Sequence, residues 1–457
     1  MSTFPITNRR DFLLSSGLGM FGLSLPQLLQ AQDVTKKKPH AKACILLFMW
    51  GGPAQQDTWD MKPDAPDVYR GEFKPISTTV PGLQISEHFP QLAKRADELC
   101  LIRSMTHNDV NHTTATHHLL TGKPAPSGGL SDDWPNYGAV LSHLGRGKGP
   151  LPPYVSMMPV VPNGAPRFVE QSHGQGAGWL GPVYNPMRID ADASLPDYHV
   201  GALRPQAELS HQRLSNRQSL LTNLDGDSGS KILPTDAVKQ ANYERAFQLL
   251  ANPTISRAFD LSLEPKKVRE RYGMNRHGQS VLQARRLVEA GVPLVTVFWP
   301  NDGITNVSVY WDTHSRNFID LKTRLCPVSD LATAALLDDL KERGMLDDTL
   351  VIWTGEMGRT PKVGQSVVGG AGAGKDGRDH WGKVFTTVLA GGGVAGGAVY
   401  GASDRFAAEP ALNPVPPKDL AATIYHLLGV DPRLELHDRL KRPLQLCDGQ
   451  IIEGILG

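Results

Sequence analysis

The sequence predicts an α/β fold with a mostly parallel central sheet. Continuous apolar runs are typical of strands buried on both faces, and five such runs occur: ACILLFMWGG, LCLIRS, PLVTVFW, TLVIWTG and FTTVLAGGG. Segments with helical spacing of apolar residues lie between or after them, namely QSVLQARRLVEAG, SDLATAALLDDLKERG and PKDLAATIYHLLG. Strands that alternate with helices indicate a parallel sheet.

Start and stop signals support the helical segments. In SDLATAALLDDLKERG, Ser329 stands where an N-cap residue belongs and Gly344 stands where a helix commonly ends. The other two segments also end in Gly. We therefore expect a helix to begin just after Ser329.

Length and charge restrict the class of protein. The chain has 457 residues, 20% of them charged, with a formal net charge of +1. This length suits one large globular domain, or one with a small subdomain. A near-zero net charge gives no electrostatic reason to expect a nucleic-acid partner.

The N-terminus carries an export signal. In TNRRDFLLSSGLGMFGLSLPQLLQAQ, Arg9 and Arg10 precede a modest apolar run, which is the pattern of the twin-arginine pathway. We assign 1–39 to this signal and a linker, and 40–457 to the main domain. The twin-arginine translocase is then a partner during export, and the protein is expected in the periplasm or otherwise outside the cytoplasm. The run is too short for a stable membrane span. Cleavage near Ala31 and retention as an uncleaved anchor both stay open.

Four cysteines, Cys44, Cys100, Cys326 and Cys447, show no zinc-binding or redox spacing. Cys44 and Cys100 lie in apolar runs, where a free cysteine is usually a small core residue. The segment at about 160–235 is rich in Gly, Pro, Ser, Asn and Gln. It is expected to form either a cap or lid over the active edge of the sheet or an ordinary surface insertion.

Acidic residues and histidines follow the ends of the apolar runs. Because ligands bind beyond the carboxyl ends of parallel strands, side chains from these places can meet at one edge. Mixed carboxylates and imidazoles at such an edge are what a metal cluster needs. The residues that we predict to converge there are Asp57, Asp312, His314, Glu356 and His380.

The stretch GGAGAGKDGRDHW, residues 369–381, begins like a phosphate-binding loop. A P-loop requires Ser or Thr after its Lys and a helix that starts there, but Asp376 follows Lys375 and the next residues are poor helix formers. We therefore interpret the stretch as a flexible approach to His380.

A set of motifs over nearly the whole chain resembles a known family. The motifs are GGP followed by DTWD, RGEFKPI, GLQISEHFPQLA, LIRSMTH, HHLLTG, WDTHSRN, TGEMGRTP, GRDHW and LAGGGVAGG. Together they resemble the twin-arginine-exported, sulfatase-like family of unknown function in the alkaline phosphatase superfamily. The resemblance implies a three-layer α/β/α sandwich that hydrolyses phosphate or sulfate monoesters with one or two divalent metals. It also implies that Asp57, Asp312, His314, Glu356 and His380 stand at or near metal-ligand positions.

The nucleophile position departs from the sulfatase pattern. Sulfatases carry C-x-P-S-R before a helix that ends in LLTG, whereas HTTATHHLLTG places His112 at the Cys position and Thr116 at the Arg position. Three interpretations stay open: Thr113 or Thr114 is a metal-activated nucleophile, a metal-activated water attacks, or the two threonines only cap the helix.

The ligand types favour zinc, manganese or iron over calcium, which prefers oxygen ligands alone. Arg359 is a candidate for binding an anionic ester with two hydrogen bonds, or for a salt bridge that holds its loop. The expected substrate is a small anionic ester or a sulfated glycan. The alternative function is a non-catalytic binding or envelope protein that has lost its nucleophile.

Replacement of Arg9 and Arg10 together by Lys is expected to block export, because the twin-arginine pathway recognises this pair. The measurement is the amount of protein in periplasmic and cytoplasmic fractions. Undiminished periplasmic accumulation of the double variant would contradict the twin-arginine interpretation.

Overall fold

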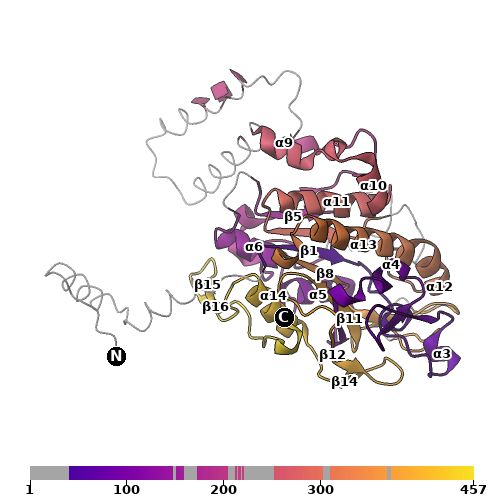
Figure 1. The fold of residues 1–457 in the computed structure, drawn as a ribbon. Helices are drawn as coiled ribbons and strands as arrows, with labels where there is room; N and C mark the ends of the chain where they lie inside the picture. The colour runs from indigo at the N-terminus through magenta and orange to yellow at the C-terminus, as the bar shows by residue number, and fades with distance from the viewer. Residues whose placement is uncertain are drawn as a thin grey trace, which may run out of the picture.

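The computed structural model describes residues 41–147, 151–158, 172–203, 252–301, 309–367 and 372–457, with a few short helical pieces between 212 and 247 (Figure 1). The twin-arginine segment lies outside the described residues. So do the parts of the 160–235 segment on either side of 172–203, apart from the short helical pieces just mentioned.

The fold is organised around an eight-stranded mixed sheet. All of its neighbouring strands pair in parallel except at β11, which runs antiparallel to both β4 and β8. Across the sheet the order is β12 (Val399–Tyr400), β4 (Leu99–Met105), β11 (Phe385–Ala390), β8 (Thr349–Thr354), β1 (Ala43–Phe48), β7 (Leu294–Phe298), β5 (Tyr154–Met157) and β6 (Met187–Ile189). The predicted α/β class with a mostly parallel sheet is confirmed, and each of the five apolar runs contains one of these strands.

Helices cover both faces of the sheet, which gives three layers (Figure 1). Helices α11 and α13 lie on one face, and α5, α6 and α14 lie on the other. The described helices are α3 (Asp67–Arg70), α4 (Pro90–Ala93), α5 (His112–Thr121), α6 (Tyr137–His143), α9 (Pro253–Phe259), α10 (Lys266–Tyr272), α11 (Arg276–Glu289), α12 (Asn317–Asp320), α13 (Cys326–Glu342) and α14 (Pro417–Leu427). None of the helices described is long and apolar enough to cross a lipid bilayer.

Two sequence expectations have different outcomes. The prediction that Ser329 caps a helix is wrong, because α13 already begins at Cys326 and continues directly from the helical turns before it. Ser329 instead lies within α13, and its hydroxyl accepts a hydrogen bond from the Trp353 indole at 2.9 Å. The expectation that Cys44 and Cys100 are core residues is confirmed, since both are buried and free.

Strand register brings several chain segments to one edge. Phe48 at the end of β1 pairs with Phe298 of β7 and with Thr354 of β8, so these three strands end side by side. Because β11 is antiparallel, it starts at this same edge, with Phe385 opposite Met105 of β4. This edge therefore brings together the residues that follow four strands, β1, β4, β7 and β8, and the residues that precede β11.

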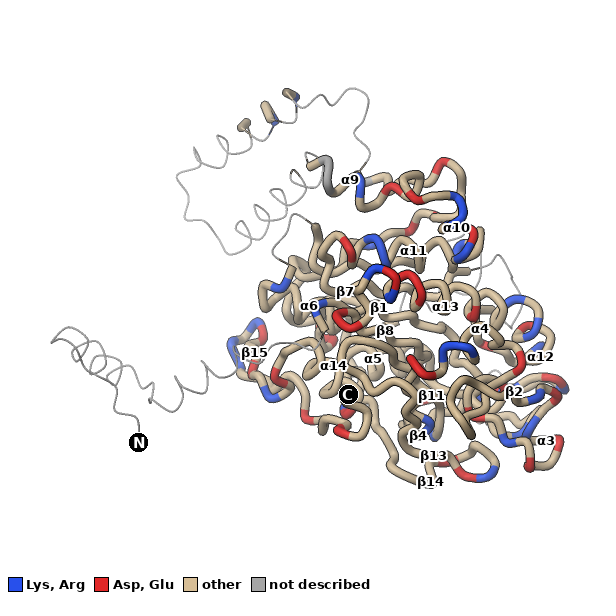
Figure 2. The backbone as a smooth tube through the Cα atoms, in the orientation of Figure 1, with Lys and Arg blue, Asp and Glu red and all other residues tan. Residues whose placement is uncertain are grey.

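A buried ion-pair network joins α11, α13 and the segment just before α10, in a region where acidic and basic residues lie close together (Figure 2). Its centre is Arg285, whose side chain is 0% exposed. The guanidinium lies 2.8 Å from Glu264, 2.5 Å from Glu289 and 2.8 Å from Asp339. Removal of a buried cation leaves buried carboxylates without their partner, which is costly.

Arg285→Ala is expected to lower the free energy of unfolding by about 3–5 kcal/mol, because Glu264 and Asp339 stay buried without this cation. Arg343→Ala is the matched control. Arg343 contacts the same Asp339 at 2.7 Å, but its side chain is 33% exposed, so a loss of about 1 kcal/mol or less is expected. Urea denaturation measures both values, and equal losses would contradict the assignment of Arg285 as the centre of the network.

Candidate metal centre

Four buried side chains meet at the edge where the strands end. They are His112, the first residue of α5, Asp312 and His314 from the segment after β7, and His380 from the short strand β10 (His380–Trp381). One ligand atom from each lies within 4.8 Å of every other. The structure thus brings together three of the five predicted ligands and adds His112.

The three imidazoles surround one carboxylate oxygen. Oδ1 of Asp312 lies 2.8 Å from Nε2 of His314, 3.2 Å from Nε2 of His380 and 3.3 Å from Nε2 of His112. The Nε2 atoms of His314 and His380 are 3.0 Å apart. Three nitrogens and one oxygen therefore point at a common position.

Hydrogen bonds at the far side of two rings fix their orientation. Nδ1 of His314 lies 2.7 Å from the carbonyl oxygen of Gly372, which can only accept, so this nitrogen carries the proton. Nδ1 of His112 lies 2.5 Å from Oε1 of Glu356. In both rings, Nε2 therefore faces Oδ1 of Asp312. A nitrogen in this position donates its proton to the carboxylate when no metal is bound, and once it has released that proton it can coordinate a cation together with the carboxylate, so the residues fit a metal ion.

The donor set also selects among metals. Three imidazole nitrogens and one carboxylate oxygen suit zinc, manganese or iron, whereas calcium takes oxygen ligands. In metal sites, a carboxylate commonly accepts a hydrogen bond from the ring nitrogen of a ligand histidine that does not face the metal. Glu356 has this relation to Nδ1 of His112.

Burial and neighbouring charges shift the pKa values of Asp312 and of the histidines around it. Burial would raise the pKa of Asp312, but the Arg359 guanidinium and His112 hold this pKa well below its ordinary value. Burial lowers the pKa of His112, yet Asp312 and Glu356 outweigh burial and raise it to about 9. For His380, burial lowers the pKa, and the nearby Arg359 adds to this effect. The site is thus built to hold a carboxylate in its ionised form.

Glu356 and Arg359 lie beside the cluster in supporting positions. The Glu356 carboxylate binds the ring of His112 and accepts the Gly51 N–H at 2.9 Å. The Arg359 side chain is fully buried, where it pairs with Asp312 and donates to the carbonyl oxygens of Gly51 and Gly52. The salt bridge, one of the two roles expected for Arg359, is present, and binding of an anionic ester stays a prediction.

Asp57, expected as the ligand from the first strand, is not among the four residues of the cluster. Its carboxylate is fully buried and accepts hydrogen bonds from Nε of Arg378 at 2.7 Å and from Asn317 at 2.8 Å. Arg378 also donates to the carbonyl oxygens of Thr360, Pro361 and Tyr69. This ion pair anchors the chain two residues before His380.

The threonines of α5 lie at the start of the helix beside His112. Asn111 is the N-cap, since its side chain accepts the Thr113 N–H. The Thr113 hydroxyl donates to the same Asn111 oxygen at 2.7 Å, and the Thr114 hydroxyl lies 3.5 Å from the Asn111 carbonyl oxygen. Neither threonine is the cap, so that interpretation is wrong.

Two glycines permit the close approach of backbone segments at the site. A Cβ on Gly51, which has φ +103°, would lie 2.3 Å from the backbone nitrogen of Asp312. A Cβ on Gly377 would lie 1.7 Å from the carbonyl oxygen of His314. The Gly-rich stretch before His380 is also hydrogen-bonded to the ligand segment, with the Gly374 N–H donating to His314 at 2.7 Å. Residues 369–371 of this stretch lie outside the described residues.

His112 is the cluster residue that the sequence prediction did not include. The available signal was its place in the HTTATHHLLTG frame, where a histidine replaces the sulfatase cysteine at the start of the helix. That position faces the ends of the strands.

Fold and site together define a three-layer α/β protein with a candidate metal centre at one edge of its sheet. The chain belongs to the family described as "Protein of unknown function (DUF1501)", whose model matches residues 41–456. A search of curated proteins finds no match.

Solved structures similar to this chain include sulfatases and other members of the alkaline phosphatase superfamily. Ps i-CgsB, solved in complex with k-i-k-neocarrahexaose, shares 12% identity over 91% of this chain and 75% of its own, with a TM-score of 0.41. The sulfatase PsFucS1 from Pseudoalteromonas sp. shares 16% identity over 90% and 72%, with a TM-score of 0.37. An alkaline phosphatase superfamily protein from Vibrio parahaemolyticus shares 12% identity over 87% and 68%, with a TM-score of 0.36.

Asp312→Asn is expected to remove most of the bound metal, because Asp312 supplies the only carboxylate among the four described ligand residues. Asp57→Asn is the matched change at an equally buried aspartate. It is expected to leave the metal content of the folded protein unchanged while lowering its thermal stability, because Arg378 loses a charged partner. Elemental analysis of the purified variants measures the metal. Loss of metal in Asp57→Asn at unchanged stability would instead assign Asp57 as a ligand.

Proposed function

We propose that this protein is an exported, metal-dependent hydrolase of phosphate or sulfate monoesters. The metal is held by His112, Asp312, His314 and His380. The observation that carries the proposal is the convergence of three Nε2 atoms on one buried carboxylate oxygen, a set of donor atoms that suits a divalent metal. A scaffold without chemistry has no need of such an arrangement.

A bound divalent metal supplies Lewis-acid chemistry, polarising an ester oxygen and lowering the pKa of water. The residues of the chain supply orientation and charge. Glu356 and the Gly372 carbonyl hold two rings with Nε2 inward. Arg359 compensates the charge of Asp312 from the buried side, so that the carboxylate stays ionised.

Water is the proposed nucleophile. It attacks phosphorus or sulfur, the bond from that atom to the ester oxygen breaks, and the oxygen leaves with a proton as an alcohol. Two observations support this: the Thr113 hydroxyl donates to Asn111, and His112, at the position of the sulfatase cysteine, is itself a member of the cluster. Twin-arginine export and the sulfate or phosphate character of the substrate are parts of the same proposal.

The double variant Thr113→Ala and Thr114→Ala is expected to keep hydrolysis of 4-nitrophenyl phosphate or 4-nitrophenyl sulfate within about threefold of the unmodified protein, since neither hydroxyl is needed as a nucleophile. His314→Ala is expected to lower hydrolysis at least about a hundredfold, because it removes a metal ligand. Initial rates of nitrophenol release measure both.

Loss of all turnover in the double threonine variant, with metal retained, would establish a covalent route through Thr113 or Thr114 instead. Absence of hydrolysis of any phosphate or sulfate monoester by the fully metallated unmodified protein would contradict the proposed activity. A non-catalytic binding protein would then be the better description.

A further inference from the structure

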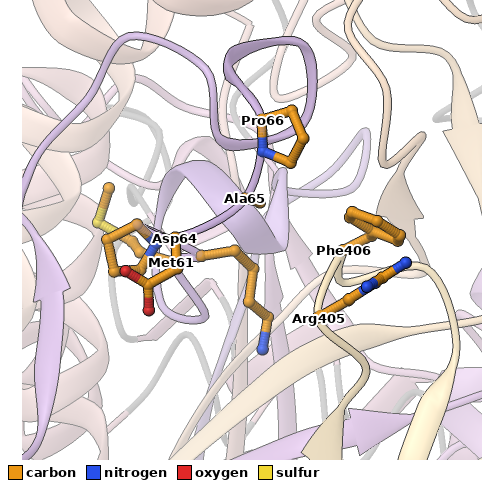
Figure 3. A pocket seen from close by; sticks show the side chains of 8 residues that line it. Met61, Asp64, Ala65, Pro66, Arg405 and Phe406 are labelled. Atoms are coloured by element: carbon orange, nitrogen blue, oxygen red, sulfur yellow. The ribbon is translucent and has the colours of Figure 1, made fainter.

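A second candidate site lies outside the metal cluster. A pocket of about 540 Å³ lies between residues 61–66 and the turn at 404–408 (Figure 3). In Figure 3, Arg405 and Phe406 lie on one side of the pocket, and Met61 and Asp64 lie on the other. The complete lining is Met61, Lys62, Pro63, Asp64, Ala65, Pro66, Arg405 and Phe406.

Arg405 is a cation with an available hydrogen-bonding edge. Its guanidinium carbon lies 4.5 Å from the centre of the Phe406 ring, and Phe406 in turn stacks on Tyr69 at 4.4 Å. Within the part of the chain that the structure describes, the Arg405 side chain has no ion pair or hydrogen bond. A guanidinium that stacks through its face keeps its N–H groups free at the edge, where they can bind an oxyanion with two hydrogen bonds.

The turn that carries Arg405 is fixed before any ligand binds. Oδ1 of Asp404 accepts the N–H of Phe406 at 3.1 Å and the N–H of Ala408 at 2.8 Å. Ala407 has φ +52°, a conformation that costs free energy for a residue with a side chain. The two side-chain hydrogen bonds hold the backbone of the turn at Arg405 in place, so this backbone loses little further entropy when a ligand binds.

The opposite wall combines apolar side chains with two charged ones, Lys62 and Asp64. Met61, Pro63 and Pro66 offer carbon surface to the body of a ligand. Lys62 is paired with the buried Asp60 at 2.9 Å, and Arg103 lies 3.7 Å from the same carboxylate. Asp60 is therefore already compensated. Asp64 also lines the pocket, but among the described residues no ion pair joins it to Arg405, so Arg405 is available to a ligand.

Hydrogen bonds connect this turn to the metal centre. The indole of Trp381, the residue after His380, donates to the Ala408 carbonyl oxygen at 2.7 Å. The side-chain amide of Gln55 donates to the carbonyl oxygens of both Arg359 and Ala407, each at 3.0 Å. The pocket and the metal ligands thus share the same supporting backbone.

We infer that this pocket binds an oxyanion carried on an organic ring, with Arg405 pairing with the anion and Met61, Pro63 and Pro66 contacting the ring. The inference rests on the proposed function and makes it more specific: the substrate carries a second anionic group, a carboxylate or a sulfate, besides the ester that is cleaved.

The test is binding of small probes to the purified protein, measured by ligand-observed NMR titration. Benzoate and benzenesulfonate, neither of which has an ester bond to cleave, are expected to bind at least about tenfold more tightly than the neutral benzyl alcohol, because charge-assisted hydrogen bonds contribute most of the affinity. The tighter of the two anions identifies the group as carboxylate or sulfate-like.

Arg405→Met is expected to weaken the anionic probes about tenfold or more, whereas Arg433→Met, at another exposed arginine outside the pocket, is expected to change nothing. Arg405→Lys keeps the charge but not the planar fork, so an intermediate affinity is expected. Equal binding of benzoate to the unmodified protein and Arg405→Met would overturn the inference. So would equal affinity for benzoate and benzyl alcohol.

His314→Ala separates this inference from the proposed function. It is expected to abolish hydrolysis and leave benzoate binding intact, because His314 does not line the pocket. If benzoate binding is lost in His314→Ala but kept in Arg405→Met, the anion binds at the metal centre and the pocket is not its site. If no anionic probe binds the unmodified protein, the inference is wrong even where ester hydrolysis is observed.

Discussion

The carboxylate of Asp312 is the group on which the candidate site depends. Its Oδ1 faces three imidazole nitrogens, and the Arg359 guanidinium contacts it from the interior. A buried carboxylate is costly unless cations compensate it. Arg359 supplies one permanent cation, and the inward Nε2 atoms provide the place for a second. The elements around the site hold these groups together before a metal binds.

Two buried ion pairs hold the chain segments that carry the residues of the cluster. Arg359 pairs with Asp312 and donates to the carbonyl oxygens of Gly51 and Gly52, so it ties the end of β1 to the ligand segment. Arg378 pairs with Asp57 and fixes the backbone that leads to His380. Ligand geometry of this kind requires rigid support, because small displacements weaken a metal site. The aspartate after the first strand thus has a positioning role in this structure.

The antiparallel direction of β11 is equally important for the site. A parallel strand in its place would carry the preceding residues, including His380, to the opposite edge of the sheet. Instead, Phe385 pairs with Met105 at the edge where β4 ends, and His380 meets the residues that follow the other strands. The same edge holds α5, whose first residue, His112, completes the cluster.

The sequence by itself determined five of the eight strands of the central sheet and three members of the cluster. Apolar runs predicted β1, β4, β7, β8 and β11, and the placement of Asp312, His314 and His380 beside strand ends predicted their convergence. Only the tertiary structure decided which of the remaining residues join the cluster. Asp57 is bonded to Arg378, 321 positions away, and Glu356 to His112, 244 positions away. A carboxylate that binds a metal and a carboxylate that pairs with a guanidinium look the same in the local sequence. The partner that distinguishes them comes from a distant part of the chain.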